Sequence, residues 1–95
     1  MSADEVMKLI PSNVRDRWRV NPGEPDRYKS GFKYEWTLGG VQYQVHGHSK
    51  DHKHDDSTNS GAGSVVRIRI GDDSLQSDGT TTTLIWKDKA HIPLF

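Results

Sequence analysis

The chain has 95 residues and no cysteine, and its 13 basic side chains balance 13 acidic ones. This length predicts one domain with a small core, and the absence of cysteine excludes disulfides and thiolate metal sites. The zero net charge excludes the overall basic excess of a typical non-specific nucleic-acid binder, so any nucleic-acid chemistry must use a local basic patch.

The N-terminal part predicts a short helix followed by an irregular arm. Ser2 and Glu5 have the spacing of a capping box at the start of a helix over residues 2–10, and a proline follows that helix. Residues 11–31 are rich in proline, glycine and charge, and residues 16–20 could add a short strand. No segment resembles a signal peptide or the roughly 18 apolar residues of a membrane span, so an exported form would take its export signal from another part of a longer protein.

Residues 32–48 give the clearest pattern in the chain. Apolar and polar side chains alternate on both sides of Gly39 and Gly40, and two glycines tolerate the positive φ angles of a type I′ turn. A two-residue loop at this point sets Trp36 opposite Tyr43 and pairs apolar with apolar and polar with polar along both strands. A shift of one residue would mix the two faces, so the pattern also predicts the register.

The C-terminal half alternates between polar loops and short strands. Residues 49–64 form a long polar loop rich in glycine and serine, and loops of this length tend to be functional or disordered. Residues 65–70 are predicted to form the third strand, residues 71–80 turns, and residues 82–87 the fourth strand. The final segment, 91–95, is predicted to lie at the margin of the sheet because a proline cannot donate to a strand ladder.

Together these elements predict a single domain over residues 1–95 of α+β class, mostly β. It would consist of a short N-terminal helix (1–10), an irregular arm (11–31) and a β-sheet core (32–95) with a mobile loop (49–64). The core would be a small, curved antiparallel sheet of about four to five strands with one polar face.

The polar face of the predicted hairpin collects ionisable side chains. With the aromatic face inward, His46 lies directly opposite Lys33 and one diagonal step from Glu35. His48 is two residues further along the same strand and points the same way. The two arginines of the third strand, Arg67 and Arg69, would join this face if that strand lies beside the hairpin.

These residue types suit cleavage of RNA through its 2′-hydroxyl group. A base removes the 2′ proton, an acid protonates the leaving 5′ oxygen, and cations stabilise the charge on the phosphorus, without a metal or cofactor. Histidine suits either proton transfer because its ordinary pKa lies near neutrality. The alternative interpretation is an ordinary solvated sheet face, and alternation on an exposed strand would explain Arg67 and Arg69 fully.

The histidine-rich tract also allows a metal site, which would suit a metal-dependent DNase. His46 and His48 form an H-x-H pair on one face of a strand, which is a plausible pair of zinc ligands. His52 and His54, by contrast, lie in the loop with no apolar support to orient them. These two histidines are therefore interpreted as bystanders, and no metal ligand is assigned.

Five short blocks of the sequence resemble the C-terminal toxin domains of bacterial polymorphic toxin systems. The blocks are RYKSGFKYEW (27–36), VHGHSKD (45–51), NSGAGSVVRIRIG (59–71), DG (78–79) and HIPL (91–94). These domains are the variable tips of contact-dependent inhibition and Rhs-type effectors, and the nearest class is the polymorphic toxin type 30 group. The resemblance covers residues 11–95, and the chain departs from it in its middle loop, where DHKHDD (51–56) is found.

The resemblance implies an interbacterial toxin that is secreted as part of a larger effector, acts in the cytoplasm of the target cell, and is held harmless in the producing cell by a cognate immunity protein. Many such domains are predicted to be small metal-independent nucleases, often ribonucleases that attack tRNA or rRNA. We expect a monomer in complex with the immunity protein, and no cofactor. The motif positions that the resemblance carries over are Lys29, Tyr34, Glu35, His46, His48, Asp51, Arg67 and His91.

The predicted function is therefore a metal-independent endoribonuclease, with a metal-dependent DNase and a non-enzymatic β-rich binding module as alternatives. His46 would be the general base or acid, with His48 or His91 as its partner, and Glu35 would orient a histidine. His91 would reach His46 if the last segment pairs beside the hairpin. The predicted substrate-binding residues are Lys29, Lys33, Tyr34, Arg67 and Arg69.

Overall fold

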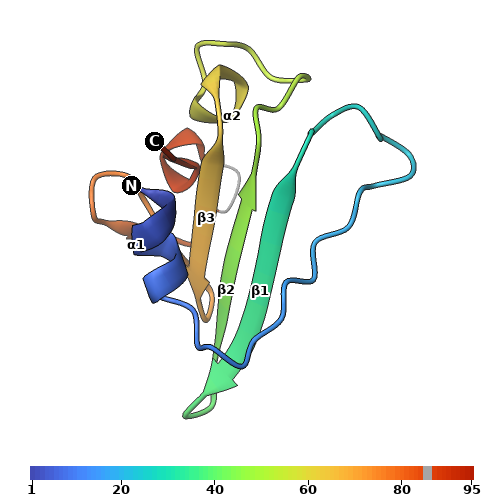
Figure 1. The fold of residues 1–95 in the computed structure, drawn as a ribbon. Helices are drawn as coiled ribbons and strands as arrows, with labels where there is room; N and C mark the ends of the chain where they lie inside the picture. The colour runs from blue at the N-terminus through green and yellow to red at the C-terminus, as the bar shows by residue number, and fades with distance from the viewer. Residues whose placement is uncertain (85–86) are drawn as a thin grey trace.

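The computed structural model describes residues 1–84 and 87–95, and its strands form one antiparallel sheet (Figure 1). In chain order the elements are α1 (Ala3–Lys8), β1 (Gly31–Leu38), β2 (Val41–His48), α2 (Asn59–Ala62), β3 (Val65–Ile70), β4 (Asp73–Leu75), β5 (Thr81–Thr82), the 3-10 helix η1 (Asp88–Ala90) and β6 (Ile92–Pro93). The strand order is β1-β2-β3-β4-β5, and β6 pairs with β3. The described residues thus have the predicted α+β, mostly β class. None of their helices is long and apolar enough to cross a membrane.

The hairpin of β1 and β2 has the predicted register. Trp36 pairs with Tyr43 and Lys33 pairs with His46. Gly39 and Gly40 have φ angles of 58° and 79°, which the tight turn requires and which few other residues adopt. The alternating pattern therefore fixes which side chains of the hairpin face the core and which face the opposite side.

Helix α1 begins as predicted and closes one face of the sheet. The hydroxyl of Ser2 accepts the backbone N–H of Glu5, and the carboxylate of Glu5 accepts the N–H of Ser2, which completes the capping box. The helix ends at Lys8, two residues before its predicted end. A helix this short is stabilised by docking, and Val6 is fully buried in the core.

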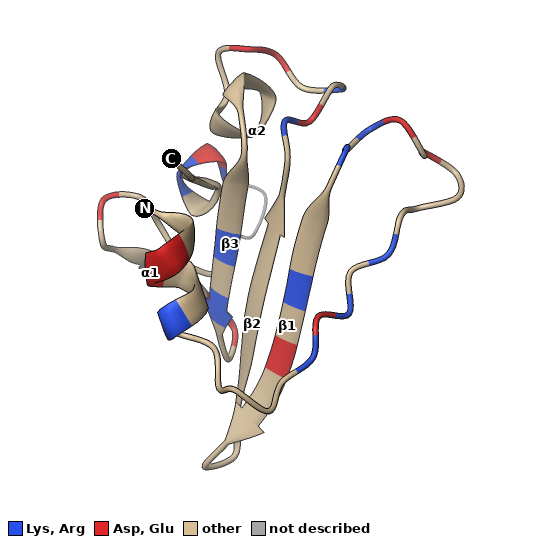
Figure 2. Ribbon diagram, in the orientation of Figure 1, with Lys and Arg blue, Asp and Glu red and all other residues tan. Residues whose placement is uncertain are grey.

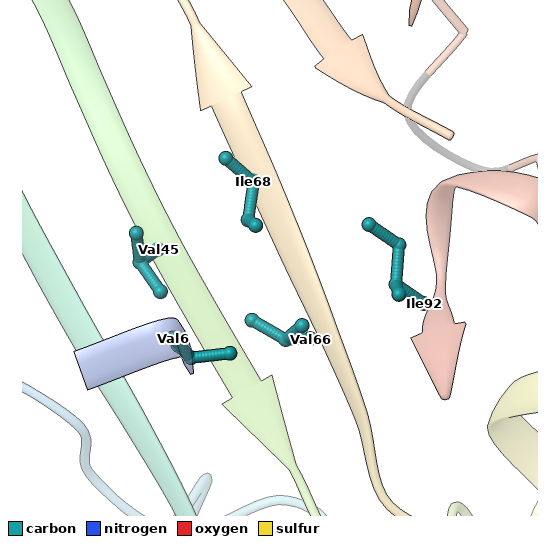
Figure 3. Packing of buried hydrophobic residues seen from close by; sticks show 5 residues of the cluster. All are labelled: Val6, Val45, Val66, Ile68 and Ile92. Atoms are coloured by element: carbon teal, nitrogen blue, oxygen red, sulfur yellow. The ribbon is translucent and has the colours of Figure 1, made fainter. Parts of the chain in front are cut away.

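The core lies between α1 and one face of β2 and β3. Figure 3 shows Val6 of α1 close to the strand residues that share this face. The buried cluster consists of Val6, Val45, Val66, Ile68 and Ile92, and the aromatic side chains of β1 pack against it. The ring of Phe32 crosses Gly47, where any added Cβ atom would collide with it. Glycine is therefore required between His46 and His48.

The arm over residues 11–31 is irregular, as predicted, and runs beside the edge of β1 (Figure 1). The strand predicted at 16–20 is wrong. The arm contacts the edge of β1 through the N–H of Arg17, which donates to the carbonyl of Lys33 (2.7 Å), and through the carboxylate of Asp16, which accepts the N–H of Lys33 (2.9 Å). A side chain thus replaces the second backbone partner that a strand ladder would need.

Two predicted boundaries in the C-terminal half are also wrong. The segment predicted as turns contains strand β4, because Gly71 adopts a φ of 61° and returns the chain alongside β3. Among the described residues of the strand predicted at 82–87, only Thr82 pairs with another strand, and its hydroxyl accepts the N–H of Leu84 (3.1 Å) in a local turn. Residues 85–86 of that predicted strand lie outside the described residues.

The segment predicted as a loop at 49–64 contains helix α2. The hydroxyl of Thr58 caps this helical turn by accepting the N–H of Gly61 (3.0 Å). Asp51 and Ser60 are buried within the segment, and the N–H of Asp51 donates to the carbonyl of Ser60 (2.9 Å). The segment therefore presents side chains from defined positions at the end of β2.

Candidate active site on the polar face of the sheet

Strand β3 lies beside β2 and brings its arginines to the face that carries the histidines. His46 pairs with Arg67, and Gln44 pairs with Arg69. Figure 2 shows the resulting basic bands on β1 and β3, one on each side of β2. The prediction that Arg67 and Arg69 share this face is therefore confirmed, and the neutral chain does carry a local concentration of positive charge.

Three histidines form a row on this face. The ring centroids of His46 and His48 are 6.3 Å apart, and those of His48 and His91 are 6.4 Å apart. The condition for a His46–His91 pair is not met, because β6 pairs with β3 and not with the hairpin. His91 is therefore the neighbour of His48.

A cleft of about 290 Å³ opens beside His48 and His91, and we refer to it as the histidine cleft. The side chains around it come from the arm, the ends of β2 and β3, the segment around α2 and the turn before β6. They belong to Arg27, Tyr28, His48, Asp51, His54, Ser60, Arg67 and His91. Residues far apart in the sequence thus converge on one concave surface.

His48 and His91 are oriented by backbone carbonyl groups. Nδ1 of His48 lies 2.7 Å from the carbonyl oxygen of Ser49, and Nδ1 of His91 lies 3.0 Å from that of Lys87. A carbonyl oxygen only accepts hydrogen bonds, so each Nδ1 carries a proton and each neutral ring keeps its lone pair on Nε2. Burial lowers the pKa of both rings, which favours this neutral form.

His46 has the opposite tautomer because it accepts a hydrogen bond from Arg67. Nη2 of Arg67 lies 2.8 Å from Nδ1 of His46, and a guanidinium group only donates. The proton of the neutral imidazole is therefore on Nε2. Burial, and then the charges of Arg67, His48 and Lys33, lower the pKa of His46 to about 4. His46 is thus a neutral hydrogen-bond donor towards its open side.

Arg67 is a half-buried cation without an acidic partner among the described residues. The Nε atom of Arg67 is buried and has no hydrogen-bond partner among the described residues. Burial lowers the pKa of Arg67, yet a guanidinium group stays protonated at neutral pH. A charge withdrawn from water without a counterion is costly, and an anion in the histidine cleft would reduce that cost.

A buried carboxylate connects the arm to the end of β2. Asp51 is 1% exposed, and both of its oxygens accept from Arg27, Oδ1 from Nε and Oδ2 from Nη2, each at 2.9 Å. Burial alone would raise the pKa of Asp51, but Arg27 and the N–H of Lys53 lower it to about 2. The Tyr28 hydroxyl also donates to Asp51 (3.3 Å). This ion pair therefore fixes Tyr28 beside the histidine cleft.

Tyr28 stands between the histidine cleft and a second one. Its ring centroid is 4.2 Å from that of His48, at an interplanar angle of 40°. The second cleft, of about 300 Å³, is named the Trp18 cleft and lies on the arm side of Tyr28. It is lined by Arg17, Trp18, Arg19, Val20, Asn21, Glu24, Tyr28, Lys33 and His46. The polar face thus holds two adjoining hollows that share one aromatic wall.

The chain matches the family model described as bacterial toxin 30 (Ntox30) over residues 5–93. It belongs to this family of toxin domains. The predicted resemblance to the polymorphic toxin type 30 group is therefore confirmed. Comparison with curated proteins and with solved structures gives no match.

Four of the residues predicted for the site lie outside both clefts of the toxin domain. Lys29 is exposed on the arm, and Tyr34 packs on the opposite face of the sheet against the core. Glu35 pairs with Lys33 (3.3 Å), and hydrogen bonds first from Gln44 and then from Lys33 lower its pKa. Arg69 lines a separate hollow further along β3.

The remaining predicted residues divide between the two clefts of the toxin domain. His48, His91 and Arg67 line the histidine cleft, and His46 and Lys33 line the Trp18 cleft. Arg27 and Tyr28 were missed by residue-type reasoning, although they open the block RYKSGFKYEW that carries the family resemblance.

The loop histidines of the toxin domain differ from each other. His54, interpreted as a bystander, lines the histidine cleft and contacts Asp51 (3.3 Å). His52 is exposed and makes no side-chain hydrogen bond with another described residue. Among residues 1–84 and 87–95, no group of three or more His, Cys, Asp or Glu side chains could hold a metal ion.

Proposed function

We propose that this toxin domain is a metal-independent endoribonuclease in which Arg67 binds the scissile phosphate and His48 and His91 transfer protons. The observation that carries the proposal is the half-buried Arg67 guanidinium, which has no acidic partner among the described residues and lies between oriented imidazoles. A phosphodiester supplies the missing anion. It would also neutralise a charge whose desolvation the fold otherwise leaves uncompensated.

The reaction would be an attack of the 2′ oxygen on the phosphorus atom of the adjoining phosphodiester. Nε2 of one imidazole removes the proton of the 2′-hydroxyl, and the 2′ oxygen forms a bond to phosphorus. The bond from phosphorus to the 5′ oxygen then breaks, and the second imidazole donates its proton to that oxygen. The products are a 2′,3′-cyclic phosphate and a free 5′-hydroxyl, and the charge on the phosphorane is stabilised by Arg67.

The tautomers favour His48 and His91 over His46 for the proton transfers. A general base needs a free lone pair, which both His48 and His91 have on Nε2. The lone pair of His46 accepts from Arg67 instead. His46 is therefore assigned to orient Arg67 and to donate a hydrogen bond from Nε2 to a phosphate oxygen.

The acid form of one histidine would depend on the bound phosphate. In the free protein, burial and the charge of Arg67 lower the pKa of both His48 and His91. A phosphodiester between them adds a negative charge within a few ångströms, which favours the imidazolium form. Substrate binding thus supplies the proton donor that the free protein lacks at neutral pH.

Delivery and inhibition follow from the family and are part of the proposal. The domain would be delivered into a competing bacterium as part of a larger effector and would act in the target-cell cytoplasm on tRNA or rRNA. A cognate immunity protein would bind one monomer and cover the histidine cleft. Membership of the toxin 30 family supports both points.

The test is cleavage of purified total RNA by the domain made by chemical peptide synthesis, with and without EDTA. His48→Ala and His91→Ala should each lower the rate by about a hundredfold or more. His52→Ala is the matched control because His52 is exposed, and it should cut at the wild-type rate. Cleavage products should carry 2′,3′-cyclic phosphate ends and should form in EDTA.

Two outcomes would reject the ribonuclease. Intact RNA in the presence of folded wild-type protein would show that the domain has no ribonuclease activity. Cleavage of DNA that stops in EDTA would favour the metal-dependent DNase, because a reaction through the 2′-hydroxyl leaves DNA intact.

A further inference from the structure

We propose that the Trp18 cleft binds one unpaired nucleotide of single-stranded RNA next to the scissile phosphate. This inference rests on the proposed function and adds the form of the substrate to it. It is carried by an aromatic wall, a set of cations and the direct connection of this cleft to the histidine cleft.

The aromatic wall consists of Trp18 and Tyr28, which both line the cleft. The indole of Trp18 lies on the backbone of Gly31 at the start of β1, and a Cβ atom at Gly31 would collide with Nε1 and Cε2 of the ring. Trp18 is half-buried in this position and is held on the sheet, although the arm around it is irregular. A fixed indole is a suitable surface on which a nucleobase can stack.

The charges around the aromatic wall favour an anionic ligand. Arg17, Arg19 and Lys33 line the cleft. None of the ion pairs between described residues involves Arg17 or Arg19. The one acidic residue of the lining, Glu24, pairs with Arg27 (3.0 Å) and with Lys53. The cleft is therefore positive within a chain of zero net charge, as a local phosphate-binding surface requires.

The Trp18 cleft adjoins the place where Arg67 would hold the phosphate. Tyr28 lines both clefts, and its ring packs on His48. His46 lines the Trp18 cleft and accepts a hydrogen bond from Arg67 of the histidine cleft (2.8 Å). A strand with its phosphate on Arg67 would therefore place a neighbouring base between Trp18 and Tyr28.

This arrangement selects for unpaired RNA. A base within a duplex is stacked and paired on both sides, and it cannot enter a hollow between two aromatic side chains without being extruded. Stacking accepts any base because every base has a π face, so the cleft alone should give little sequence preference. We therefore expect cleavage in single-stranded loops, bulges and ends.

The test uses a short fluorescein-labelled 2′-O-methyl RNA of mixed sequence, which lacks the 2′-hydroxyl and cannot be cut through it. Trp18→Ala should weaken binding by about tenfold, and Trp18→Phe should restore most of the affinity. Tyr43→Ala is the matched control: it removes an aromatic ring from the opposite face of the hairpin and should bind as the wild type does.

The outcomes separate this inference from the ribonuclease. If Trp18→Ala binds the single strand and cuts RNA as the wild type does, the nucleotide subsite is rejected and the ribonuclease stands. If the wild type binds the single strand through Trp18 but leaves RNA intact, the ribonuclease is rejected and the subsite stands. Equal affinity for the same sequence as a duplex would reject the preference for unpaired RNA. Thermal unfolding of each variant shows that the comparison is between folded proteins.

Discussion

The two faces of β2 and β3 are built from alternate residues of the same strands, yet one face is apolar and the other, apart from the buried Val65, carries polar side chains. On one face Val45 is 1% exposed and Val66 is fully buried, and both pack against apolar neighbours. On the other face His48 is 5% exposed, and His46 and Arg67 are half-buried among polar groups. Burial stabilises the first face and costs free energy on the second.

This difference supports the proposed function, in which the polar face binds RNA. Arg67 could have been paired with a carboxylate, as Arg27 is with Asp51 in the lining of the same cleft. Instead its described neighbours are three imidazoles that its own charge helps to keep neutral. Natural proteins depart from the rule of paired buried charges mainly where function requires it.

Replacing Arg67 should have the largest effect on cleavage and should distinguish the roles of the two faces most clearly. Arg67→Met keeps the length of the side chain and removes the buried charge, so the free energy of unfolding should stay equal or rise. RNA cleavage should fall by about a thousandfold because the phosphorane loses its cation. The measurements are urea unfolding and kcat/KM on one RNA. Arg69→Met, on the same strand but outside both clefts, should cut within about threefold of the wild type. Retained cleavage by Arg67→Met would contradict the proposed role.

Acid should destabilise the protein through the buried histidines of the polar face before its carboxylates titrate. The pKa of His46 is about 4 in the folded state against an ordinary value of 6.5, so between these values the unfolded chain binds a proton that the folded chain does not. Its contribution is complete above pH 6.5 and is lost as the pH falls towards 4, up to about 3 kcal/mol. His48 and His91 act in the same direction, and Asp51, with a pKa of about 2, contributes only below pH 4.

Urea unfolding between pH 7.5 and pH 4.5 measures this dependence. The midpoint should fall steadily below pH 6.5, and His46→Gln should make the decline shallower because one titrating group is gone. An unchanged midpoint over this range would show that the imidazoles are not buried as the structure has them.

A core substitution should lower the stability and leave cleavage unchanged, which is the reverse of the effects expected for Arg67→Met. Val66→Ala removes two methyl groups from a fully buried site between α1 and the sheet, which should lower the free energy of unfolding by about 2 kcal/mol. The folded fraction should cut RNA at the wild-type kcat/KM, because Val66 faces away from both clefts. A selective loss of cleavage without a change in the urea midpoint would contradict the division between the faces.

The features that could be predicted from the sequence are those that depend on a regular spacing of nearby residues. Alternation around Gly39 and Gly40 specified the register of the hairpin, and the same alternation at residues 65–70 put the side chain of Arg67 on the histidine face. The capping box at Ser2 was recognised for the same reason, since its two partners are three residues apart.

The features that could not be predicted depend on contacts between irregular segments. The pair of Arg27 and Asp51 joins the arm to the loop after β2, and neither segment has a period from which the contact follows. β6 pairs with β3 through only two residue pairs of a short terminal strand, and this pairing places His91 beside His48 rather than beside His46. The tautomers depend on single hydrogen bonds to Ser49 and Lys87, which no residue pattern encodes.

Replacing His46 should slow cleavage less than replacing Arg67 or His48, and should define how its role differs from that of His48. His46→Ala removes the acceptor that orients Arg67 and one donor to the phosphate, so kcat should fall by about tenfold, well short of the loss in His48→Ala. His46→Gln should recover most of the rate, because an amide has both an oxygen that accepts from Arg67 and an N–H that donates. The pH–rate profile of both variants should keep the limbs of the wild type, since His48 and His91 still exchange the protons. If His46→Ala instead abolished cleavage and His46→Gln removed one limb of the profile, His46 itself would be the acid or the base.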